Sequence, residues 1–125
     1  MRPTILVIDD DKPMREMIGH VLRSSDYRVV DTQDGSEAVA LVAHHNVDLV
    51  VMDLIMPERD GFETMVEFRR DCPHVPVIAM SGFGETAEVN YLKTAKDLGA
   101  RAVLEKPFTA SKLLALVRQI LPDPR

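Results

Sequence analysis

Short hydrophobic runs recur along the chain and are separated by longer amphipathic stretches. Four of the runs are continuous and rich in β-branched residues, a pattern typical of strands covered on both faces in a parallel sheet. These runs are residues 5–8, 49–52, 77–80 and 102–104. A weaker run at residues 28–30 predicts an edge strand or a less buried strand.

The stretches between these runs repeat apolar residues at intervals of three and four positions, which predicts amphipathic helices. The first stretch follows Pro13, the third ends before Pro73, and the fourth stops at Gly99, all residues suited to helix boundaries. The five predicted helical stretches are residues 14–22, 38–42, 62–69, 92–98 and 113–121. Strand and helix therefore alternate five times. Right-handed crossovers wind such an order into an α/β fold, a doubly wound five-stranded parallel sheet between two helical layers.

Composition narrows the class of protein further. A chain of 125 residues with 46% hydrophobic and 28% charged residues is expected to form one domain over residues 1–125 and not a disordered chain. The net charge of -5 argues against direct binding to nucleic acid or to an anionic membrane surface. No apolar stretch is long enough to span a membrane, and the single Cys cannot form an internal disulfide. We therefore expect a cytoplasmic location.

Polar residues follow four of the predicted strands. Asp9 and Asp10 follow the first strand, Asp53 ends the third, Ser81 ends the fourth and Lys106 follows the fifth. Ligands of open parallel sheets bind outside the carboxyl ends of the strands, near the point where the strand order reverses. These side chains are therefore expected to meet at one edge of the sheet.

This combination of residues favours phosphoryl-transfer chemistry. Converging carboxylates repel one another unless a cation compensates, and Mg²⁺ suits a few carboxylate oxygens plus phosphate oxygens. Lys106 and the Ser81 hydroxyl can both contact phosphate oxygens. Asp53 stands apart from the other acids and is the natural nucleophile, a carboxylate that can form an acyl phosphate. Asp11 is expected to cap the first helix. For the other acids, helix capping is the structural alternative to a role in phosphoryl transfer.

At these residues the sequence resembles a CheY-like receiver domain of a two-component response regulator, over essentially the whole chain. Each matching motif is weak alone, but their joint occurrence in this order is specific. The resemblance also implies a flavodoxin-like sandwich. The matching segments are Asp9-Asp10, Asp34-Gly35, Asp53-Leu54-Ile55-Met56-Pro57 with Asp60-Gly61, Ser81-Gly82 and Lys106-Pro107-Phe108.

The resemblance implies a role for each site residue. Asp53 would accept a phosphoryl group from a sensor histidine kinase or a phosphotransfer protein, while Ser81 and Lys106 would bind the phosphoryl oxygens. Asp10 would bind Mg²⁺ directly and Asp9 mainly through water. The implied metal ligands are Asp9, Asp10, Asp53 and the backbone carbonyl of Ile55.

The resemblance also implies a signalling output in place of enzymatic turnover. Phosphorylation would switch the face formed by the fourth helix, fifth strand and fifth helix, for a downstream effector protein or an attached output domain. The only chemistry would be self-phosphorylation and slow self-dephosphorylation. The Lys106-Pro107 bond would be cis, and a weak homodimer is a further expectation.

Three positions depart from the family pattern. Val103 stands where most receivers have an aromatic residue that moves on activation, so the switch is expected to run through the loop after Ser81, with Phe83 or Phe108 as the moving bulk. Ile55 and Phe83 occupy the positions that tune loss of the phosphoryl group. Because both are apolar, neither can orient a water molecule, which predicts the slow self-dephosphorylation.

Three other functions fit parts of the pattern. A haloacid-dehalogenase-like phosphatase needs a second acid two positions after its nucleophile, and Ile55 stands there. A flavodoxin-like cofactor binder would place phosphate against Asp9 and Asp10, which would repel it. A pseudo-receiver that serves only as a docking module is the remaining alternative, and Val103 favours it.

Overall fold

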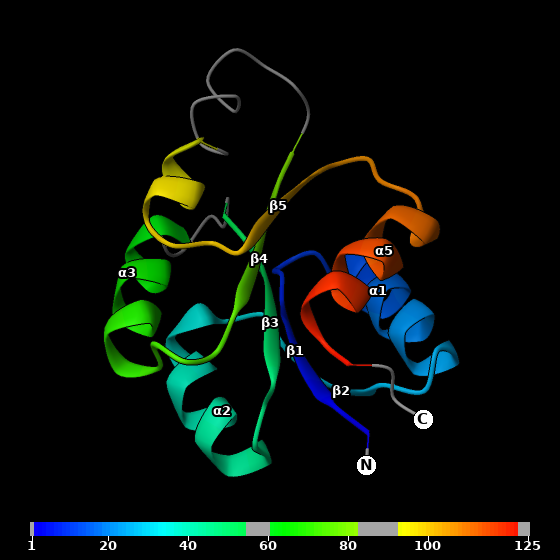
Figure 1. Ribbon diagram of the computed structural model, residues 1–125, viewed down its shortest axis with the longest axis horizontal. Helices are drawn as coiled ribbons and strands as arrows, with labels where there is room; N and C mark the ends of the chain where they lie inside the picture. Colours follow the sequence, from blue (N-terminus) through cyan, green and yellow to red (C-terminus); the bar gives the residue numbers. More distant parts are fainter. Residues whose placement is uncertain (1, 55–60, 83–92, 123–125) are drawn as a thin grey trace.

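The structure, a computed structural model, describes residues 2–54, 61–82 and 93–122. Five parallel strands form one sheet in the order β2-β1-β3-β4-β5 (Figure 1). The strands are β1 (Thr4–Ile8), β2 (Arg28–Thr32), β3 (Leu49–Asp53), β4 (Val77–Ser81) and β5 (Ala102–Glu105). The helices are α1 (Lys12–Ser24), η1 (Gly35–Glu37), α2 (Ala38–His45), α3 (Gly61–Asp71) and α5 (Ala110–Ile120), and residues 93–97 are also helical.

Helices cover both faces of the sheet, as the alternation of the elements predicts. In Figure 1, α1 and α5 lie on one side of the sheet, and α2, α3 and the helical residues 93–97 lie on the other. Strand β2 lies on one side of β1, and β3, β4 and β5 follow in turn on its other side. This is the strand order of flavodoxin-like folds. The predicted α/β fold class is therefore confirmed.

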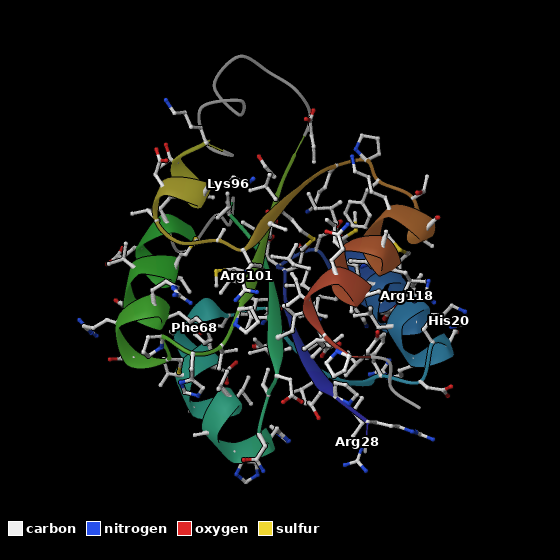
Figure 2. The ribbon with its side chains drawn as sticks, in the orientation of Figure 1. His20, Arg28, Phe68, Lys96, Arg101 and Arg118 are labelled. Atoms are coloured by element: carbon white, nitrogen blue, oxygen red, sulfur yellow. The ribbon has the colours of Figure 1, made fainter. Side chains whose placement is uncertain are left out.

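The continuous hydrophobic runs divide their side chains between two cores because successive strand residues face opposite ways. Ile5 and Val7 pack with Leu22 of α1 and Val117 of α5. Leu6 and Ile8 belong to the opposite core, which includes Phe68 of α3. In Figure 2 Phe68 lies on the α3 side of the sheet. The strands β1, β3 and β4 are buried along their whole length.

The prediction of full burial was wrong for the first two residues of the run at 102–104, whereas Leu104 is buried as predicted. Strand β5 forms an edge of the sheet, and its first two residues, Ala102 and Val103, are only half-buried. The prediction that residues 28–30 form an edge strand is confirmed, since β2 lies at the other edge. The run of apolar letters could not distinguish β5 from an internal strand, because an edge position depends on strand order.

Two apolar residues predicted on buried helix faces are exposed. Met17 on α1 is 37% exposed and Val66 on α3 is 51% exposed. On α3 the buried side chains are Met65, as the spacing predicts, together with Thr64 and Phe68. Among the described residues, no helix is both long enough and apolar enough to cross a membrane.

Candidate functional site

The sheet brings the predicted site residues together at the carboxyl ends of its strands. Ile8 pairs with Met52 across β1 and β3, so Asp9 and Asp53 end neighbouring strands. Ser81, the last residue of β4, pairs with Glu105 of β5, directly before Lys106. Arg28 marks the opposite end of the sheet, near the amino terminus (Figure 2). The site therefore lies at the carboxyl ends of the strands, where β1 and β3 form the switch point in strand order.

Three carboxylates form the acidic part of the site. Asp9, Asp10 and Asp53 each offer one oxygen, and these oxygens all lie within 4.8 Å of one another. No other such group of acids, His or Cys occurs in the described part of the chain. Asp9 is fully buried, Asp53 is 5% exposed and Asp10 is exposed to solvent. Clustered carboxylate oxygens, one of them open to water, fit a hard divalent cation such as Mg²⁺.

Lys106 provides the opposing charge. Its Nζ lies 3.0 Å from Oδ2 of Asp9 and 3.3 Å from Oδ2 of Asp53, and it donates a hydrogen bond to each. Burial alone would lower the pKa of Lys106, but the charges of Asp53 and Asp9 and their hydrogen bonds outweigh it and raise this pKa. Lys106 is therefore held protonated between two acids, one of them the predicted nucleophile.

Ser81 is the remaining predicted side chain of the site. It is fully buried, and its Oγ has no hydrogen-bond partner among the residues the structure describes. Its backbone oxygen accepts a hydrogen bond of 2.7 Å from the amide of Lys106, which ties the end of β4 to the start of the lysine loop. A buried hydroxyl without a partner is costly, and it is ready to bind a ligand oxygen.

The loop from β1 to α1 differs from the prediction in one respect. Asp11 stands at the N-cap position of α1, but its side chain makes no capping hydrogen bond, so the predicted cap was wrong in its chemistry. Instead, the backbone amide of Asp11 donates to Oδ1 of Asp9 at 2.9 Å.

Arg15 was not predicted as a site residue. Its Nη1 donates a hydrogen bond of 2.9 Å to the backbone oxygen of Asp9. The sequence held a signal for this contact, since Arg15 lies three and seven positions before the buried residues Ile18 and Leu22 and therefore shares their face of α1.

The remaining predictions divide into those inside and those outside the described residues. The Lys106-Pro107 bond is cis, as predicted. Phe108 is half-buried and packs on the core beneath α1 and α5. Ile55 and Phe83 lie outside the described residues. The carbonyl of Ile55 as a metal ligand and the effect of both residues on dephosphorylation therefore stay predictions.

The fold and the site define a class of protein: a flavodoxin-like α/β protein with three carboxylates, a lysine and a buried serine at the switch point of its sheet. The family model described as "Response regulator receiver domain" matches residues 5–118. The chain belongs to this family. It is therefore the receiver domain of a two-component signalling protein and not a member of a classical enzyme family.

Individual relatives agree with this assignment. "Response regulator MprA" of Mycobacterium sp. (strain KMS) is 36% identical over 117 residues, which cover 94% of this chain and 50% of that protein. "Probable transcriptional regulator ycf27" of Guillardia theta is 33% identical, covering 94% of this chain and 44% of that protein. The chain thus spans about half the length of the curated relatives it matches.

Solved structures share the fold over nearly the whole chain. Chemotaxis protein CheY4 of Vibrio cholerae is 28% identical with a TM-score of 0.84, and the match covers 97% of this chain and all of that one. The receiver domain of NtrX from Brucella abortus is 27% identical with a TM-score of 0.87, covering 94% of this chain and 97% of that one.

Proposed function

We propose that this receiver domain accepts a phosphoryl group on Asp53 from a phosphohistidine of a sensor kinase or phosphotransfer protein. The supporting observation is the position of the Asp53 carboxylate, 3.3 Å from the Lys106 amine and beside Asp9 and Asp10. Asp53 is the last residue of β3 and is nearly buried, whereas Asp9 follows the end of β1 and Asp10 is exposed. A nucleophile so placed is shielded from water yet reachable from the edge of the sheet.

The transfer exchanges one bond to phosphorus for another. A carboxylate oxygen of Asp53 attacks the phosphorus, and the phosphorus–nitrogen bond of the phosphohistidine breaks. The electron pair of that bond stays on the imidazole ring. Lys106 neutralises negative charge on the phosphoryl oxygens, and the Ser81 hydroxyl donates to one of them once the group is attached.

Mg²⁺ is the proposed cofactor, because the carboxylate oxygens and the exposure of Asp10 fit its preferences. Asp9, Asp10, Asp53 and the carbonyl of Ile55 would hold it, Asp9 mainly through water. When bound, the ion neutralises charge between the carboxylates and the incoming phosphoryl group. Lys106 alone offers one positive charge against three negative ones.

The proposed output is a shift between two arrangements of the loop after Ser81. The attached phosphoryl group offers an acceptor to the Ser81 hydroxyl, which has no other partner in the described residues. A difference of ~3 kcal/mol in this interaction between two loop arrangements changes their ratio roughly a hundredfold. The helical residues 93–97 with β5 and α5 would carry the change to a downstream effector or an output domain.

Several broader properties belong to the same proposal. Residues 1–125 form one receiver domain, located in the cytoplasm, that needs neither nucleic acid nor membrane for its phosphoryl chemistry. Self-phosphorylation from a small acyl phosphate is expected, and so is slow self-dephosphorylation. A weak homodimer is a further prediction.

Phosphoryl uptake tests the function. Protein incubated with Mg²⁺ and a small acyl phosphate should gain the mass of one phosphoryl group, and Asp53→Asn should gain none. Asp11→Asn is the matched control, because Asp11 is an exposed acid of the same loop whose side chain caps nothing. Wild-type protein that gains no mass would favour the docking-module alternative instead.

A further inference from the structure

Arg15 makes an unusual contact for a surface helix residue. It lies in the second turn of α1, is half-buried, and directs Nη1 to the backbone oxygen of Asp9. Its Nε is buried without a hydrogen-bond partner in the described part of the chain. An arginine that reached into solvent would avoid this cost of desolvation, so the contact with Asp9 must outweigh it.

The bonded oxygen belongs to the peptide group that joins Asp9 to Asp10. A peptide group is planar, so fixing its carbonyl oxygen also fixes the direction of the Asp10 amide and the position of the Asp10 Cα. The other polar atoms of Asp9 are held as well. Its amide donates to Thr32, its Oδ1 accepts from the Asp11 amide, and its Oδ2 accepts from Lys106.

Asp10 has no comparable support of its own. Its side chain is exposed, and it makes no hydrogen bond or ion pair with any described residue, yet its oxygen lies within 4.8 Å of those of Asp9 and Asp53. An exposed aspartate without a partner is free to rotate, and the carboxylates beside it repel it. The backbone is therefore the element that keeps Asp10 at the cluster.

We propose that Arg15 is a positioning residue for Asp10: its hydrogen bond to the Asp9 carbonyl fixes the Asp9–Asp10 peptide so that the Asp10 carboxylate stays at the cation site. The inference rests on the proposed function, since it assigns Arg15 to the same Mg²⁺ site. Arg15 touches neither the ion nor the phosphoryl group in this account and acts only through Asp10.

The direction in which Mg²⁺ affinity changes in an Arg15 variant distinguishes a positioning role from an effect of charge. A guanidinium near three carboxylates repels a cation, so removing its charge should by itself strengthen Mg²⁺ binding. Removing the hydrogen bond should weaken it. Weaker binding in an Arg15 variant would therefore report the loss of position.

Calorimetric titration of the ion-free protein with Mg²⁺ tests the proposal. Arg15→Gln should bind Mg²⁺ about tenfold more weakly, a typical loss for residues that orient a metal ligand. Arg15→Lys keeps the charge but lacks the planar fork, and it should also bind more weakly. Lys12→Gln is the matched control, because Lys12 is an exposed cation of the same helix whose partner is Glu16. Its affinity should equal that of wild type or exceed it.

A double-mutant cycle tests the route through Asp10. Because Arg15 acts through Asp10, the affinity losses of Arg15→Gln and Asp10→Asn should not add in the double variant. Thermal unfolding without Mg²⁺ should show each variant folded. Affinities of both Arg15 variants equal to wild type, or fully additive losses, would overturn the inference. A wild-type protein that binds no Mg²⁺ would instead overturn the proposed function.

Discussion

Asp9 shows how much of the site depends on single polar contacts. It is fully buried, and its carboxylate accepts from Lys106 on one oxygen and from the Asp11 amide on the other. A buried charge is tolerated only when it is paired and hydrogen-bonded. Lys106 has the complementary position, since it joins Asp9 to Asp53. The ion pairs hold the pocket together before any phosphoryl group arrives.

The raised pKa of Lys106 predicts a loss of stability at high pH. Below an ordinary lysine pKa of about 10.4, Lys106 is charged in both the folded and the unfolded protein, so its contribution is fully present. Above that pH the unfolded chain loses the proton first, and the contribution falls until the pH passes the folded pKa. Urea unfolding of wild type and Lys106→Met between pH 8 and pH 11.5 measures the difference, which should shrink at the alkaline end.

Lys112→Met is the control for this experiment, because Lys112 is an exposed lysine on α5. Its stability should stay at a constant offset from wild type over the same pH range. A constant offset for Lys106→Met as well would show that the two acids do not raise the pKa of Lys106.

Among the elements, η1 and α3 approach each other closely. A Cβ built on Gly35 would lie 2.8 Å from Cγ2 and 2.9 Å from Oγ1 of the buried Thr64 side chain. Glycine is thus required by space and not by backbone conformation. The sequence could not reveal this neighbour, because Thr64 belongs to a different helix.

Gly35→Ala should therefore destabilise the protein. We expect a loss of about 1–3 kcal/mol in the free energy of unfolding, the usual cost of forcing an added methyl group into a packed contact. Thr64→Ala removes both atoms of the close contact and leaves Thr64 Cβ at 3.4 Å, so Gly35→Ala should cost less in that background. Denaturant unfolding of the four proteins measures the coupling, and purely additive losses would refute the contact.

Sequence patterns predicted the elements well and their surroundings less well. The strands came from runs of β-branched residues, and the site came from the acids, serine and lysine at their ends. The half-burial of Val103 and the exposure of Met17 were missed, because burial depends on strand order and on what packs above each helix. The helical spacing placed Arg15 on the buried face of α1, but its partner is a backbone oxygen, and the sequence alone does not show which backbone group lies there.

At the scale of the whole molecule, the acidic pocket links stability to the cation. Without Mg²⁺ the three carboxylates repel one another, and the fold bears that repulsion. A ligand that binds only the folded state adds stability according to its concentration, about 2.7 kcal/mol at a hundred times its dissociation constant. The proposed function therefore lowers the stability of the ion-free fold, because the three acids that it requires repel one another.

Asp10→Asn should make this relation visible. Without Mg²⁺ the variant should gain about 1 kcal/mol in the free energy of unfolding, the repulsion between like charges roughly 4 Å apart in water. With saturating Mg²⁺ for wild type, the order should reverse. Thermal unfolding with and without Mg²⁺ provides the measurement, and Asp31→Asn, an exposed acid on β2, should respond to Mg²⁺ as wild type does. Equal Mg²⁺ responses of wild type and Asp10→Asn would exclude Asp10 as a ligand.

The location of the phosphoryl group tests the central claim most directly. After incubation with a small acyl phosphate and Mg²⁺, borohydride reduces an aspartyl phosphate to an alcohol, and peptide mass spectrometry identifies the reduced residue. We predict reduction at Asp53 alone, and none when the divalent cation is chelated. Reduction at Asp9 or Asp10, or at Asp53 to the same extent without the cation, would contradict the account.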